Sequence, residues 1–167
     1  MATLPPFVLT ISVDGQEALS IGLSRFADAI KDFKPFWDEY FKSAWYRTVD
    51  THYVTQGRST GEAWAPLSER YGVWKQKHWP GLPVGVLSGA TRESLTFAND
   101  ANAVWEPTDT SLEVGTRVPH ATYLQRGTGR MPARPPLRVG QEFLLQVGKL
   151  LQEFGVKTAR EQGLAFE

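Results

Sequence analysis

Apolar residues recur along this chain at two spacings, every second residue in some segments and every third or fourth in others. Residues 7–13 are rich in β-branched side chains and are followed by Asp14-Gly15, which favours a tight hairpin turn, so the pattern predicts a strand. Alternation of apolar and small residues over 19–23 predicts the returning strand. Residues 16–32 also fit an amphipathic helix; we favour the hairpin, with a helix beginning near Ser24.

Two further segments show clear helical spacing. Proline fits the first turn of a helix, and after Lys34-Pro35 apolar residues recur at 3.6-residue spacing over 36–49, which predicts the longest helix of the first half. Its apolar face is unusually aromatic, and we interpret it as part of the core rather than a platform for ligand stacking. Residues 144–154 predict a C-terminal helix, and the weak pattern of 156–167 indicates a tail or arm.

Glycine and proline interrupt the middle of the chain. Residues 56–89 are interpreted as a long loop that contains a short helix at 68–78, and another helix is expected to begin at Ser88. Turn-forming dipeptides separate three strand-like segments that together indicate an antiparallel meander: 95–98, 103–107 and 111–115.

These patterns together predict a single α+β domain over residues 1–167. Its small antiparallel sheet would comprise the N-terminal hairpin and the meander, packed by the long helix and the C-terminal helix, with the long Gly/Pro-rich loop at one side. We also expect Trp64, Trp74 and Trp79 to be partly buried, because large apolar groups in a polar loop usually find a contact.

Composition narrows the classes of function. The 167 residues carry a formal net charge of zero, so no overall field would attract nucleic acid or an anionic membrane. There is no cysteine, which excludes disulfides and thiol chemistry. We find no basic start with a long apolar run and no stretch of about 18 apolar residues, so we expect cytoplasmic synthesis and no membrane partner.

The residues that commonly carry chemistry do not form a recognisable site. The three histidines lie far apart without a ligand at helical spacing, and Ser68 lacks a glycine elbow and suits a helix N-cap instead. Gly127 and Gly129 lack the lysine and the surrounding elements of a phosphate loop. The acids are scattered rather than paired. We therefore expect no catalytic residues, no metal and no cofactor.

Charge is nevertheless segregated locally. Residues 93–116 hold five acids and no Lys or Arg, whereas residues 114–141 hold five arginines and no acid. Four of these arginines fall at every fourth position on a segment whose prolines exclude a helix. On an extended strap at 131–137 that spacing would bring them to one side, although polyproline geometry, with its period of three, would fan them around the strap.

Three interpretations of the arginines remain open: a solvated loop, contacts with DNA phosphates, or head-to-tail packing in which the arginines of one subunit meet the acids of the next. We favour subunit contacts. The residues concerned are Arg117, Arg126, Arg130, Arg134, Arg138, Glu106, Asp109 and Glu113.

Four stretches of the chain resemble motifs of one family. They are GEAWAPLSERY at 61–71, similar to G-x-x-W-x-P-L-S-x-x-Y; LSGATRESL at 87–95, similar to L-T/S-G-x-L-R-x-S-L; VGTRVPHATYLQRGT at 114–128, similar to G-T-x-V-P-Y-A-x-x-H-Q-x-G-T; and MPARPPL at 131–137, similar to M/I-P-A-R-P-F/P-L/I. In order and spacing they resemble the phage virion morphogenesis family, the tail-completion proteins of Mu-like and related tailed phages. A lysine also follows the first motif, at Lys75 or Lys77.

The positions that carry the resemblance are Trp64, Pro66, Leu67, Ser68, Tyr71, Gly89, Gly115, Pro119, Gly127, Pro132 and Pro135. The chain departs from the family pattern at three positions. His120 replaces the usual tyrosine, Leu124 replaces the usual histidine, and Thr91 stands where leucine is common.

The resemblance implies a structural, non-enzymatic virion protein at the neck or upper tail. It implies a homo-oligomeric ring of six or twelve copies between head connector and tail tube, in contact with neighbouring neck, connector or tube proteins and made in the host cytoplasm. Non-specific contact with genomic DNA in the ring lumen is the second use we expect of the arginines. The alternative function is a DNA-binding accessory protein that uses the basic segment 117–138.

Overall fold

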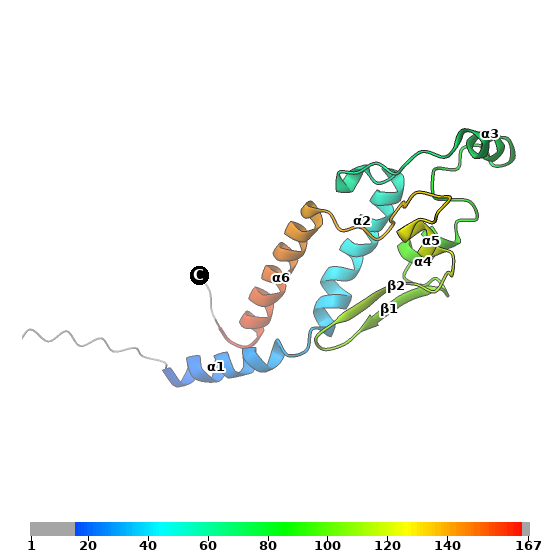
Figure 1. Cartoon of the computed structure of the whole chain (residues 1–167). Coiled ribbons are helices and arrows are strands. Elements are labelled where there is room, and N and C mark those ends of the chain that lie inside the picture. The colour runs from blue at the N-terminus through cyan, green and yellow to red at the C-terminus, as the bar shows by residue number, and fades with distance from the viewer. Residues whose placement is uncertain (1–15, 165–167) are drawn as a thin grey trace, which may run out of the picture.

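The computed structural model describes residues 16–164, with side chains from residue 20 onward. This part of the chain contains six α-helices and one two-stranded antiparallel sheet, which confirms the α+β class (Figure 1). The elements are α1 Gln16–Ala29, a π-helical segment Phe36–Phe41, α2 Lys42–Val54, a 3₁₀ turn Arg58–Thr60, α3 Glu69–His78, α4 Ala90–Thr96, β1 Ala103–Pro107, β2 Leu112–Thr116, α5 Ala121–Arg126 and α6 Gln141–Glu161. No helix among them is both long and apolar enough to cross a membrane.

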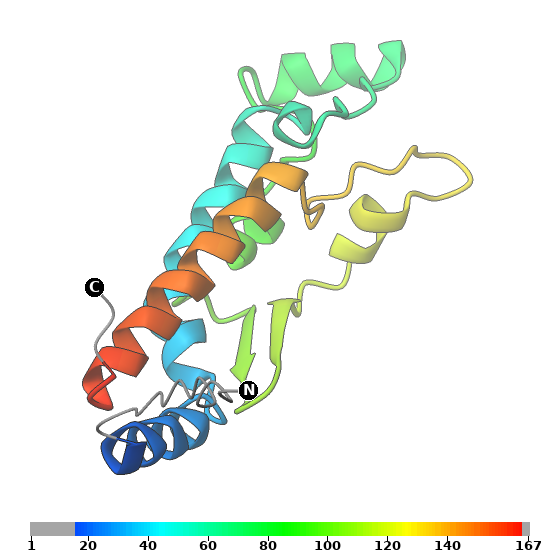
Figure 2. The same cartoon turned by 90° about the vertical axis from the view of Figure 1, so that its left-hand side faces the viewer.

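The framework of the molecule is the antiparallel pair formed by α2 and α6, which lie side by side in both views (Figures 1 and 2). Near the start of α6, the Phe143 ring lies 5.6 Å from that of Phe41 and 5.9 Å from that of Trp45. Near its end, Phe154 lies 5.6 Å from Phe36, before α2. The predicted helix at 36–49 is confirmed, and its aromatic face belongs to the core.

The sheet is a single hairpin that packs against the side of α2. Trp105 of β1 pairs with Val114 of β2, and both side chains contact the core cluster that surrounds α2. The predicted strands at 103–107 and 111–115 are confirmed, the second displaced by one residue. The predicted strand at 95–98 is wrong, because residues 90–96 form α4, which buries Thr91, Ser94 and Leu95 on one helical face. The meander is therefore reduced to a hairpin.

The returning strand predicted at 19–23 is also wrong, and the helical alternative is confirmed, since these residues lie within α1. Gly22, Phe26 and Ile30 recur at four-residue spacing and are buried or half-buried. A Cβ on Gly22 would lie 2.8 Å from Leu164 Cδ2, so α1 rests directly on the chain beyond α6. The predicted strand at 7–13 and its turn lie outside the described residues.

The C-terminal helix is confirmed and is longer than predicted. It runs from Gln141 to Glu161, so the tail predicted at 156–167 is wrong as far as residue 164. Thr158, Ala159 and Leu164 are buried and continue the packed face past the point where the sequence pattern fades. The loop at 56–89 is confirmed, with α3 inside it as expected.

Candidate functional site

The four motif stretches converge on one groove at the end of the molecule that carries α3, α4 and α5 (Figure 1). We call it the motif groove; its volume is about 540 Å³. Every stretch contributes to its walls: Pro66, Leu67, Ser68 and Tyr71 from the first, Leu87, Ser88, Gly89, Thr91 and Arg92 from the second, His120, Tyr123, Leu124 and Thr128 from the third, and Met131, Pro132 and Arg134 from the fourth. Segments far apart in sequence thus form one surface.

Trp64 of the first motif lies behind the groove and fastens the long loop to α2. Its indole meets the rings of His52 and Tyr53 edge to face, with centroids 5.4 and 5.3 Å apart. Two glycines with positive φ, Gly57 and Gly85, approach the indole so closely that a Cβ on either would lie within 3 Å of it. The burial predicted for Trp64 is confirmed, whereas Trp74 and Trp79 are each 41% exposed and pack on one another.

Arg134 joins the fourth motif to the first. Its side chain is only 4% exposed; Nε donates to Ala65 O at 2.7 Å and Nη2 donates to Pro66 O at 2.9 Å. Its backbone N–H also donates to Leu124 O of α5, at 2.8 Å. The guanidinium thus supplies donors to two carbonyls of the first motif stretch, and two of its three nitrogens are engaged inside its own chain.

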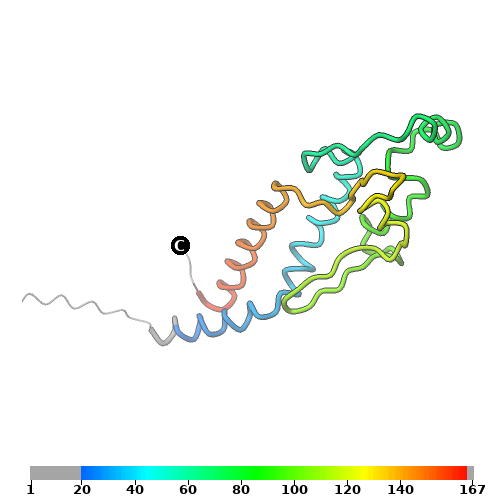
Figure 3. Tube along the Cα trace, in the orientation of Figure 1, coloured from blue at the N-terminus to red at the C-terminus, as the bar shows by residue number. Residues whose placement is uncertain are grey.

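Arg138, four residues after Arg134, also turns toward the stretch 61–71, where it pairs with Glu62. The four-residue spacing therefore does bring Arg134 and Arg138 to one side of the strap at 131–137, and that side faces residues 62–66 of the same chain. Figure 3 follows this stretch of chain from α5 to the start of α6.

A second buried cation lies beside the groove. Lys75 of α3 is 4% exposed, and its Nζ donates to Pro83 O at 2.6 Å. Burial, reinforced by the positive charge of Arg134, holds the pKa of Lys75 below its usual value. Among the described side chains, residues 20–164, no carboxylate pairs with either Lys75 or Arg134, and the groove lining contains no Asp or Glu.

His52 anchors the end of the strap to α2. Its Nε2–H donates to Pro135 O at 3.0 Å, and its Nδ1 accepts from the Ser59 hydroxyl at 3.1 Å. The side chain is almost wholly buried, and burial holds its pKa below the usual value, with Arg138 adding to the shift and the bond to Pro135 opposing it. No local pattern indicates this role, because His52 and Pro135 are 83 residues apart.

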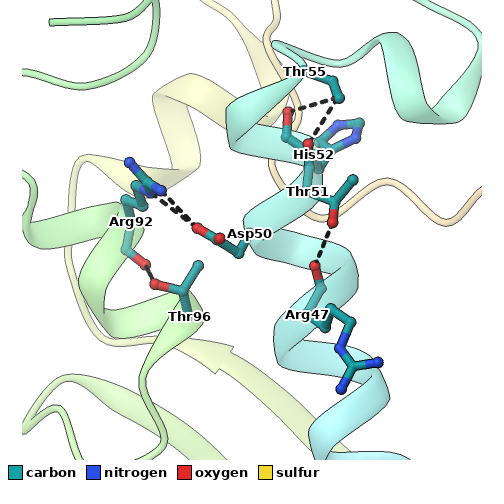
Figure 4. Close-up of polar contacts among 7 residues, drawn as sticks. All are labelled: Arg47, Asp50, Thr51, His52, Thr55, Arg92 and Thr96. Atoms are coloured by element: carbon teal, nitrogen blue, oxygen red, sulfur yellow. Dashed lines mark hydrogen bonds and ion pairs between the residues drawn. The ribbon is translucent and has the colours of Figure 1, made fainter.

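α4 is tied to α2 by an ion pair at the edge of the groove (Figure 4). Arg92 donates to Asp50 Oδ1 through Nη2 at 2.7 Å and through Nε at 3.2 Å. In α2 the Thr51 hydroxyl donates to Arg47 O at 2.8 Å, and at the C-cap of the helix the Thr55 hydroxyl donates to Thr51 O at 2.8 Å. Asp50 was not among the residues that the sequence singled out.

The remaining charged candidates are divided between paired and free groups. Arg117 donates to Glu106 at 2.9 Å along the hairpin, and Asp109 pairs with Lys34 at 2.6 Å. Arg126 and Arg130 are exposed and pair with no carboxylate in the described part of the chain. Glu113, directly opposite Glu106 in the hairpin, has no ion pair there either.

Several motif residues shape the backbone in and around the groove. Ser68 occupies the N-cap position of α3, as predicted, although its hydroxyl makes no capping bond. Gly127 ends α5, and Pro119 precedes that helix by two residues. Gly115 lies within β2, opposite Val104. Among residues 16–164 no group of three or more His, Asp or Glu side chains could hold a metal ion.

The site is thus a groove with apolar, aromatic and cationic walls on a small α+β protein, an arrangement typical of a binding surface. No protein-family model, no curated protein and no solved structure matches the chain.

Proposed function

We propose that this protein is a structural component of a tailed-phage virion that acts in tail completion and head–tail joining. It would form part of an oligomeric ring at the neck or upper tail and contact neighbouring connector or tail tube proteins. The proposal extends the motif resemblance, with the ring of six or twelve copies and the absence of catalysis taken from the family.

The observation that supports it is the convergence of all four motif stretches on one groove. Short strings that resembled a family by chance would have no reason to meet in space. Here the first and fourth are joined by Arg134, and the third and fourth by the backbone bond between Arg134 and Leu124. The resembling residues therefore form one physical unit.

The surface of the helical framework also suits an assembly. Leu144 and Leu145 on α6 are 60% and 64% exposed, and Ile21 of α1 is similarly uncovered. Apolar groups of this size on helix faces are commonly buried when subunits associate. Arg126 and Glu113 remain charged candidates for contacts between subunits, and Arg130 remains available to a subunit or a neighbouring protein.

The DNA-binding alternative has less support from the arrangement of charge. Three of its five arginines are already engaged within the chain: Arg117 with Glu106, Arg134 with two carbonyls, and Arg138 with Glu62. A guanidinium held in this way has fewer free N–H groups for a phosphate, and its charge is partly neutralised where the partner is a carboxylate.

The test is electron microscopy of lysates from a phage that lacks the gene for this chain. We expect DNA-filled heads separate from tails, with tails of irregular length, and joined particles when the wild-type gene is supplied in trans. Normally tailed particles without the gene would contradict the proposal.

A further inference from the structure

The walls of the motif groove combine apolar surface with charge of one sign. Leu67, Val86 and Met131 line it, and Tyr71 and Tyr123 stand at its border with 39% and 58% of their surfaces exposed. Its charged lining consists of Lys75, Arg92, Arg130 and Arg134. A ligand of matching chemistry would be anionic and would also carry apolar side chains.

Two of these cations are buried without an opposite charge. Lys75 and Arg134 are each 4% exposed, are close enough for Arg134 to depress the Lys75 pKa, and donate only to neutral carbonyls. A buried charge without a counter-charge is costly even when hydrogen bonded. Arg134 donates through Nε and Nη2, which leaves Nη1 for an incoming acceptor.

Arg130 extends the positive charge to the groove border. It is exposed, lines the groove, and pairs with no carboxylate of the described residues. Arg92 differs, because Asp50 already neutralises it. The uncompensated charge therefore runs from Arg130 at the border to Arg134 and Lys75 at the buried side.

The occupant that fits is a slender segment rather than a folded surface. A groove of about 540 Å³ has the size of sites that take a small ligand or a few residues of a peptide. The acidic hairpin of a second copy fits poorly, since it is two strands wide and two of its three acids, Glu106 and Asp109, are already paired with Arg117 and Lys34.

We infer that the motif groove binds an extended acidic segment of a partner protein. A carboxylate of that segment lies against Arg130 and the buried pair of cations, and a neighbouring apolar side chain packs on Tyr71 and Tyr123. This carboxylate supplies the negative charge that Lys75 and Arg134 lack among the described side chains of their own chain. Identification of the partner as an adjacent virion protein rests on the proposed function; the chemistry of the segment does not.

The experiment uses the full chain and two pools of fluorescein-labelled hexapeptides. In both pools four positions vary among Leu, Val, Phe and Tyr, and the second and fourth positions are Glu in one pool and Gln in the other. We expect the Glu pool to bind at least about tenfold more tightly in fluorescence anisotropy, and its binding to weaken as NaCl is added. Equal binding of the two pools, or no binding of either, would overturn the inference.

Variants on exposed residues locate the binding without endangering the fold. Arg130→Glu and Tyr123→Ala should each reduce affinity for the Glu pool by about tenfold. The matched control is Arg126→Glu, which makes the same charge change at an exposed arginine that does not line the groove, and it should bind as the wild type does. An equal loss in Arg126→Glu would mean general charge attraction and would also overturn the inference.

Sedimentation velocity without peptide tests the competing occupant. We expect Arg130→Glu and the wild type to sediment alike. If the wild type associates with itself and Arg130→Glu abolishes this, the groove takes a second copy and the partner inference is wrong. The outcome is separable from that of the gene deletion, since peptide binding can hold while tailed particles form without the gene, and the reverse can also occur.

Discussion

At the scale of single residues, the most consequential side chains are polar groups buried where two distant segments meet. His52, Lys75 and Arg134 are each less than a tenth exposed, and each donates to a backbone carbonyl of a loop. These loops contain proline, which has no N–H and leaves carbonyls without backbone donors. The buried side chains therefore hold the loops that helices and strands do not.

The first prediction concerns the pH dependence of stability that His52 creates. Its folded-state pKa lies below the ordinary value of about 6.5, so the unfolded chain binds more protons as pH falls through this value. The contribution is present above about pH 6.5 and is lost as the pH falls toward the folded pKa. We expect the free energy of unfolding, measured with urea at pH 7.5 and 5, to fall more for the wild type than for His52→Gln.

The control for this prediction is His120→Gln, which changes an exposed histidine. Its pH dependence should match that of the wild type. If His52→Gln and the wild type lose the same free energy between the two pH values, His52 does not contribute as described.

At the scale of elements, the strap at 131–137 is held by a few side-chain contacts. It makes no strand or helix, and Arg134 connects it both to the first motif loop and to α5. His52 holds its far end at Pro135. A segment fixed by side chains in this way loses its fixed position when those side chains are removed.

The second prediction follows for Arg134→Ala. The substitution leaves Ala65 O and Pro66 O without their donors, and hydrogen bonds from charged groups contribute about 1.5–3 kcal/mol each, without full additivity. We expect the free energy of unfolding to drop by about 2–4 kcal/mol in urea denaturation. Arg126→Ala, at an exposed arginine of the same region, should change it by no more than about 0.5 kcal/mol. Similar losses in the two variants would show that the Arg134 hydrogen bonds do not stabilise the fold as described.

The helices that the sequence predicted correctly are those with a long, regular apolar period. Residues 36–49 and 144–154 supply several helical turns of evidence, whereas the short strands at 103–107 and 111–115 are marked by the turn-forming dipeptide between them. The errors at 19–23 and 95–98 arose in stretches of four or five residues, where both periods can be read. Over 19–23 the helix is supported by a contact that is not local: Leu164, more than 140 positions away, packs on Gly22.

The candidate site was predictable in its residues and not in its geometry. The motif positions marked Pro66, Tyr71 and Pro132, all of which line the groove. Nothing local shows that Lys75 is buried or that Arg134 turns toward its own chain, because a cation with no acid nearby in sequence looks solvated. Those facts depend on the packing of loops from opposite halves of the chain.

At the scale of the whole molecule, overall neutrality conceals two differently charged regions. The hairpin side carries Glu106, Asp109 and Glu113, and the groove carries cations without acids. Because the total charge is zero, long-range attraction to nucleic acid is weak, and association depends on which local surface meets the partner.

The third prediction applies this to DNA. Of the arginines in segment 117–138, only Arg126 and Arg130 lack a partner in the described residues. In a plot of the logarithm of the observed binding constant against the logarithm of salt concentration, each phosphate contact contributes about −0.9 to the slope. For the isolated protein on duplex DNA we expect a slope no steeper than about −2, lost in the Arg126→Ala, Arg130→Ala double variant. A slope of about −4 or steeper would favour the DNA-binding alternative.

The packing of Trp64 between two glycines has a consequence for how this chain can evolve. Gly57 and Gly85 combine a positive φ with a contact that excludes a Cβ, and the indole fills the space that both leave. At Gly85 the indole is the nearest obstacle to a Cβ, whereas at Gly57 a Cβ would also lie 2.5 Å from Glu62 O, and the positive φ disfavours a side chain at both positions. A smaller residue at Trp64 opens a void that neither glycine can fill. Single substitutions at any of the three positions are therefore disfavoured, and we expect descendants of this sequence to keep all three.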